Sequence, residues 1–140
     1  MKLDHIGIAV FSLDEALQTY KSLGFHVEDI VTLEEQKVRV AILPAGEGRI
    51  ELLEPTADDS VIRKFLEKKS QGVHHLCFKV DSLEEKLEQL KPTNVQVLDQ
   101  VPCRGYEERK VAFLHPKTTH GVLIELYQLN ATAEEASAEV

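Results

Sequence analysis

One segment of the sequence occurs twice, and this internal repeat constrains the fold more than any other feature. Residues 4–17 return as residues 74–87, with His5 aligned to His75 at an offset of 70 positions. Two shorter pairs of similar segments follow: residues 40–43 match residues 111–114, and residues 50–52 match residues 124–126. The chain is therefore predicted to be built from two copies of one module.

The composition is that of one compact globular domain. With 140 residues and 43% hydrophobic content the chain is long enough for a proper core. Each half has only about 60 residues and would be marginal alone, so the halves are expected to share a core or to pair with another chain. We expect a single domain over residues 1–130, followed by a flexible acidic tail over residues 131–140.

Charge and hydropathy exclude several classes of partner. The net charge of −8 argues against nucleic acid and anionic membranes. No apolar run approaches the ~20 residues of a membrane span, and the N-terminus lacks a signal-peptide pattern. Two cysteines outside any paired motif are typical of a reducing, cytoplasmic protein.

Each module is predicted to open with a strand that separates aliphatic residues from a histidine. In residues 5–10 the aliphatic side chains share one face while His5 lies on the other, and residues 75–80 repeat this alternation with His75. The aliphatic face is expected to lie under a helix, which leaves each histidine on the opposite face.

A helix is predicted directly after each of these strands. Ser12 with Glu15, and Ser82 with Glu85, have the spacing of a capping box, in which the two side chains bond to the first free amide groups. Apolar residues at helical spacing follow both boxes, and Gly24 and Pro92 are plausible stops; the stripes are Leu13, Ala16, Leu17 and Tyr20, and Leu83, Leu87 and Leu90.

Three extended segments follow each helix, which gives the order βαβββ twice and an α+β fold. They are residues 25–33, 37–43 and 49–54 in the first half, and residues 95–101, 109–114 and 122–129 in the second. Module 1 covers about residues 1–56 and module 2 about residues 72–130. A linker helix is predicted between them at about residues 59–70.

The repeat also predicts a divalent-metal site. Each module begins with a strand histidine and ends with a strand glutamate, so a pseudo-twofold axis would gather His5, Glu51, His75 and Glu125. Carboxylates among Ile, Leu and Val are costly unless they are paired or bound to metal. A lone strand histidine is usually structural, and an inter-module salt bridge is the alternative for the glutamates.

The chain resembles the vicinal oxygen chelate superfamily and, within it, the methylmalonyl-CoA epimerase family. The resemblance runs to about residue 130 and is carried by residues 4–10, 50–55, 72–76, 113–117 and 121–126. The histidine and glutamate positions are shared by the whole superfamily, whereas the His-His pair and the Phe-Leu-His-Pro-Lys segment are more specific to the family. The resemblance implies paired βαβββ modules that form a cupped mixed sheet around a metal.

The resemblance also implies a ligand set and a reaction. The family's ligands fall on His5, His75 and Glu125, with Glu51 at a fourth position that is Gln or Glu in related proteins. Imidazole and carboxylate ligands suit Co, Mn, Zn or Ni and leave positions open for substrate oxygens. The implied activity is epimerisation of methylmalonyl-CoA, in which a proton leaves C2, an enolate-like intermediate forms, and a proton returns from either face.

One departure from the family concerns the general base. A non-ligand glutamate of some members falls here on Arg39 or Val40, and neither can accept a proton in this role. Glu51 and Glu125 are therefore the candidate catalytic bases. Basic residues are candidates for the coenzyme A phosphates; they are Lys37, Arg39, Arg104, Arg109, Lys110 and Lys117.

Three other functions of the superfamily remain alternatives: a lactoylglutathione lyase-like glyoxalase, a ring-cleaving dioxygenase, and a non-enzymatic protein that sequesters a ligand. The acid–base histidines of a dioxygenase cannot be placed, and sequestering members usually lack the four ligands. His74 is expected to support the site or to be exposed, Cys77 to be a small buried hydrophobe, and Cys103 to lie in a loop. A homodimer is expected.

Overall fold

The computed structural model describes residues 1–98, 103–104 and 109–129, so the predicted acidic tail lies outside the described residues. The chain divides into two compact units. The N-terminal unit comprises Asp4–His75, and the C-terminal unit comprises Met1–Leu3 together with the chain from Leu76 onward. Among the described residues, none of the helices has the length and apolar character needed to cross a bilayer.

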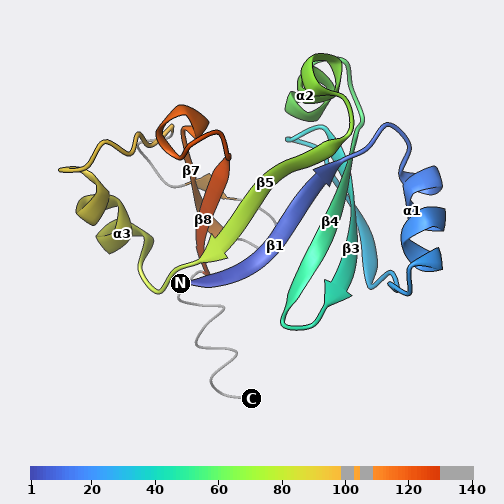
Figure 1. The fold of residues 1–140 in the computed structure, drawn as a ribbon, viewed down its shortest axis with the longest axis horizontal. Coiled ribbons are helices and arrows are strands. Elements are labelled where there is room, and N and C mark those ends of the chain that lie inside the picture. Colours follow the sequence, from blue (N-terminus) through green and yellow to red (C-terminus); the bar gives the residue numbers. More distant parts are fainter. Residues whose placement is uncertain (99–102, 105–108, 130–140) are drawn as a thin grey trace. The chain divides into compact units, whose positions relative to one another are not determined.

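The N-terminal unit is a four-stranded mixed sheet with two helices (Figure 1). Its elements are β1 (Lys2–Ala9), α1 (Leu13–Ser22), β2 (Asp29–Leu33), β3 (Val38–Ala45), β4 (Gly48–Pro55) and α2 (Val61–Lys69). The strand order is β2-β3-β4-β1, with β1 parallel to β4 and the other pairs antiparallel. This is the predicted βαβββ order, and α2 is the predicted linker helix.

The C-terminal unit repeats this arrangement. Its elements are β5 (Gly72–Lys79), which begins in the N-terminal unit, then α3 (Leu83–Leu90), β6 (Cys103–Arg104), β7 (Arg109–Leu114), the 3₁₀ turn Pro116–Thr118 and β8 (Ile124–Leu129). The order is β5-β8-β7-β6, with β5 parallel to β8 and the other pairs antiparallel. The registers also correspond, since Gly7 pairs with Glu51 and Cys77 pairs with Glu125.

In each unit one helix packs on a sheet face and closes a small apolar core. Leu13 and Leu17 of α1 pack with Ala41, Leu43 and Leu52 of β3 and β4. In the C-terminal unit Leu83 of α3 packs with the equivalent strand residues, namely Val80, Ala112, Leu114 and Leu126. The predicted apolar stripes therefore face the core, and the alternating strands turn their aliphatic side toward the helix.

Both predicted capping serines accept a hydrogen bond at the start of their helix. Ser12 Oγ accepts from the Glu15 amide and Ser82 Oγ from the Glu85 amide, each at 3.2 Å. A side chain from β4 or β8 accepts a second hydrogen bond at the start of each helix. The amide of Leu13 donates to Glu54 at 2.6 Å, and the amide of Leu83 donates to Gln128 at 2.8 Å. The internal repeat therefore includes the contacts that anchor the helices.

Two expected extended segments and one expected loop differ from the observed strands. The segment at residues 25–33 is a strand only from Asp29, because the side chain of Phe25 packs against the apolar core beneath α1. In the segment at residues 95–101, the described part forms only an isolated bridge between Val97 and Leu114. Cys103 was expected in a loop, and it lies instead in β6, where its backbone pairs with Val111.

Candidate metal site

His5 and His75 meet through the same ring nitrogen. Their Nε2 atoms lie 3.0 Å apart, and the two rings are nearly perpendicular, at 88°. Both residues are buried, with exposed fractions of 4% and 8%. His5 lies on β1 and His75 on β5, each on the face opposite the aliphatic residues, as the alternation predicts.

The Nδ1 atom of each of these rings is engaged by the residue that precedes it in the chain. His5 Nδ1 lies 2.8 Å from Asp4 Oδ2, and His75 Nδ1 lies 2.9 Å from His74 Nδ1. A histidine that donates a hydrogen bond from Nδ1 has its Nε2 lone pair available for a cation. The two neighbours therefore direct both Nε2 atoms toward one point.

Two carboxylates and one guanidinium lie beside His5. Arg49 Nε donates to Glu51 Oε2 at 2.8 Å, and Arg49 Nη2 lies 3.2 Å from Asp4 Oδ2. Glu51 Oε2 is also 3.3 Å from His5 Nδ1. These side chains are at most 18% exposed, so the charges interact with little solvent screening. The guanidinium thus neutralises carboxylates that would otherwise repel each other.

Three of the four predicted ligands, His5, Glu51 and His75, belong to the N-terminal unit. Glu51 is buried on β4, beside Gly7 of β1. Its Oε2 atom lies toward the Nδ1 side of His5, whereas the histidine pair meets at Nε2. Glu125 lies on β8 of the C-terminal unit, half-buried and paired with Cys77 and Phe113.

The side chains of the N-terminal unit fit a divalent cation. Two nitrogens held about 2.1 Å from one cation and at right angles to each other would be about 3.0 Å apart, which is the observed Nε2 separation. Imidazole nitrogens are donors that first-row divalent metals accept. The two histidines therefore fit a divalent cation between their Nε2 atoms, whereas Glu51 Oε2 lies on the Nδ1 side of His5.

The family's non-ligand glutamate position contains no base in this chain. Val40 pairs with Leu53, on the sheet face that also presents Glu51, and is buried. Arg39 pairs with Glu54 on the other face, and its Nη1 atom lies 3.9 Å from Glu54 Oε1. This region therefore offers an apolar side chain and a cation where some relatives have a carboxylate.

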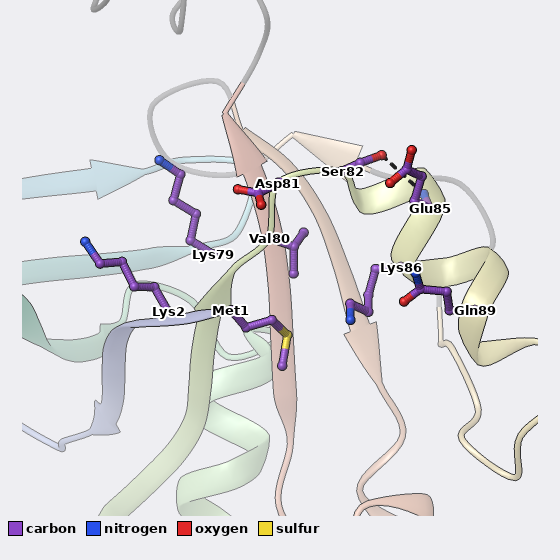
Figure 2. Close-up of a pocket in the computed structure, with 9 residues that line it drawn as sticks. All are labelled: Met1, Lys2, Lys79, Val80, Asp81, Ser82, Glu85, Lys86 and Gln89. Carbon is purple, nitrogen blue, oxygen red and sulfur yellow. Dashed lines mark hydrogen bonds between the residues drawn. The ribbon is translucent and has the colours of Figure 1, made fainter.

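The C-terminal unit contains a cavity of about 410 Å³ with mixed charge (Figure 2). Its charged lining residues are Lys2, Lys79, Lys86, Asp81 and Glu85. Lys2 and Lys79 extend to one side in Figure 2 and Lys86 to the other, so the three ammonium groups do not converge. The described lining includes none of the basic residues predicted as phosphate contacts.

Cys77 is buried in the C-terminal unit, and its packing agrees with the predicted structural role. It belongs to an apolar cluster with Val111 and Tyr127. His115 caps the short 3₁₀ turn, where its Nδ1 accepts from the Lys117 amide at 3.1 Å. Neither residue is required by the histidine pair.

Asp4, Arg49 and Gly7 were not among the predicted site residues, although all three contact predicted ligands. Asp4 neighbours His5 directly, and strand alternation would place it on the opposite face. Arg49 and Gly7 each lie two residues from a predicted ligand and share its face. The same alternation that selected His5 and Glu51 places these two residues on the ligand face but does not reveal which side chains they contact.

Comparison with known proteins places the chain among epimerases. Residues 4–113 match the glyoxalase/bleomycin resistance protein/dioxygenase superfamily. Methylmalonyl-CoA epimerase from Homo sapiens is 40% identical over 91% of this chain and 73% of that protein. The uncharacterized protein YqjC of Bacillus subtilis is 47% identical over 89% of this chain and 90% of its own length.

Solved structures show the same fold. The Mycobacterium tuberculosis methylmalonyl-CoA epimerase has a TM-score of 0.85 at 34% identity and covers 96% of this chain and 91% of its own. A Streptomyces coelicolor methylmalonyl-CoA epimerase variant, solved with 2-nitronate-propionyl-CoA, has a TM-score of 0.84 at 38% identity, covering 94% and 96%. The predicted α+β fold is therefore confirmed, and the chain belongs to the methylmalonyl-CoA epimerase family of the glyoxalase superfamily.

Proposed function

We propose that this protein is an isomerase that interconverts the 2R and 2S epimers of methylmalonyl-CoA in propionyl-CoA metabolism. The observation that carries the proposal is the buried Nε2–Nε2 pair of His5 and His75. Relatives of this chain in the same family are named methylmalonyl-CoA epimerases. The reaction removes the C2 proton to give an enolate-like intermediate, which is then protonated from either face.

His5, Glu51, His75 and Glu125 are the residues that we assign to a divalent cation of the Co, Mn, Zn or Ni class. When bound, the cation supplies a fixed positive charge that stabilises the negative charge developing on the thioester oxygen. The support within the N-terminal unit is the burial of both imidazoles and the hydrogen bonds at their Nδ1 atoms. Glu125 is assigned from the internal repeat.

Glu51 and Glu125 are also the residues that we assign to proton transfer at C2. Each carboxylate would serve one face of the substrate, which epimerisation requires. Glu51 Oε2 is held by Arg49, so Oε1 is the oxygen that can turn toward another partner without breaking this bond. The apolar Val40 supports this choice, because no carboxylate stands at the alternative position.

The test is hydrogen exchange at C2 in D₂O. Wild-type protein with bound metal should introduce deuterium at C2 starting from either epimer, and His5→Ala should lose both stoichiometric metal and exchange. Glu51→Gln retains a carbonyl oxygen and should keep the metal, yet lose about 10²- to 10⁴-fold in turnover, the usual contribution of a positioned general base. Metal-loaded wild type without any exchange would refute the epimerase assignment.

Two further parts of the proposal concern the assembly and its compartment. We assign the working form to a homodimer, because each module core is small. We assign it to the cytoplasm, because the two cysteines are not in a paired motif.

A further inference from the structure

The ring of His75 lies directly over Gly7, in space that any larger residue would fill. A Cβ atom at Gly7 would be 2.2 Å from His75 Cε1, 2.6 Å from Nδ1 and 2.9 Å from Nε2. Ordinary contacts are 3.4–4 Å, so the ring would have to move by more than an ångström. The ring is buried and its neighbours are packed, which leaves no small adjustment that keeps its place.

His74 fixes the other property of the same ring, namely which nitrogen carries the proton. If His75 Nδ1 donates to His74 Nδ1 across their 2.9 Å separation, His75 Nε2 is left with a lone pair facing His5. His74 is in turn held by Phe65 of α2, with ring centroids 4.9 Å apart and the planes at 85°. A chain of contacts therefore runs from α2 through His74 to His75.

We propose that Gly7 and His74 are positioning residues for the metal ligand His75. Gly7 provides the space in which the ring lies, and His74 accepts the Nδ1 proton that directs Nε2 toward His5. This inference rests on the proposed function, because it takes His75 as a ligand. It adds that two residues without any bond to the cation determine how well the site binds it.

The decisive variants are His74→Phe, His74→Asn and Gly7→Ala. Phenylalanine keeps an aromatic ring for Phe65 but cannot accept a hydrogen bond, so affinity for Co²⁺ or Zn²⁺ should fall about 10- to 100-fold. Asparagine places a carbonyl oxygen near the former Nδ1 position and should recover most of this loss. Gly7→Ala should weaken binding at least as much as His74→Phe. His26→Phe, the same change at an exposed histidine, should leave the affinity unaltered.

Four readouts separate positioning from a general loss of structure. Metal affinity is measured by competition with a chromophoric chelator, and the Co²⁺ absorption spectrum reports changes in the ligand geometry. Thermal unfolding of the metal-free proteins shows whether each variant folds. Long-range ¹H–¹⁵N spectra of the Zn²⁺-loaded protein report the Nδ1 proton of His75, whose chemical shift should indicate a hydrogen bond to His74 in wild type and should change in His74→Phe.

The outcomes also distinguish this inference from the proposed function. Folded His74→Phe and Gly7→Ala proteins with wild-type affinity and an unchanged His75 Nδ1 proton signal would overturn the inference and leave the epimerase assignment intact. Wild type that takes up no cation would refute the metal assignment. The inference would then fall with it, because it takes His75 as a ligand.

Discussion

At the scale of single residues, Arg49 is the counter-charge for the two carboxylates beside His5. It donates to Glu51 and pairs with Asp4, and both carboxylates also approach His5 Nδ1. Without the guanidinium, two largely buried negative charges would face each other with only an imidazole between them. Such an uncompensated charge costs several kcal/mol in a protein interior.

Arg49→Met is therefore expected to destabilise the metal-free protein by about 1–3 kcal/mol, the range for lost hydrogen bonds to charged groups. Bound divalent metal should restore part of this loss, because a nearby cation offsets the same negative charge. The measurement is urea unfolding of wild type and variant, each with chelator and with metal. An equal loss of stability in both conditions would contradict this assignment of Arg49.

At the scale of elements, the helices depend on contacts that both units repeat. Ser12 and Ser82 occupy the same position before α1 and α3, and each accepts a hydrogen bond from the third following amide. We expect Ser12→Ala and Ser82→Ala each to cost about 1 kcal/mol of unfolding free energy. Ser22→Ala at the end of α1 is the control. Ser22 Oγ donates to a helix carbonyl instead of capping amides, so its loss should be nearly neutral.

The sequence predicted the elements whose signals are local. Capping boxes located the first residues of α1 and α3, and alternation located the two histidine strands, although each strand begins three residues earlier than predicted. These patterns are informative because they reflect contacts between neighbours in the chain. Strand β6 was missed because its two residues are defined by pairing with β7, and nothing local marks them. The start of β2 was misplaced for a similar reason, since packing of Phe25 against α1 decides it.

The site residues likewise divide into those that local sequence patterns predict and those that depend on contacts between strands. The repeat singled out His5, Glu51 and His75, and in the N-terminal unit the two histidines meet at Nε2 while Glu51 contacts His5 at Nδ1. Arg49 and the space over Gly7 could not be deduced from periodicity alone, because their roles depend on which side chain from another strand lies opposite. His74 was expected either to support the site or to be exposed. Its contact with His75 Nδ1 favours the supporting role.

At the scale of the whole molecule, the small cores favour association with a second copy. Each unit buries one helix against one sheet face, and domains of about 60 residues bury too little surface to be securely stable. Large apolar side chains also remain at the surface of the N-terminal unit, where Phe11, Val61 and Val73 are 53%, 65% and 57% exposed. Such residues are candidates for burial between subunits.

We therefore predict a homodimer at micromolar concentration. Sedimentation velocity should give about twice the 15.8 kDa mass of the chain. The unfolding midpoint should rise with protein concentration, because association stabilises only the folded state. The interface should bury at least about 1,000 Å², the area that stable contacts require. A single species of monomer mass, with a midpoint that does not depend on concentration, would show that the two modules stabilise each other without a second chain.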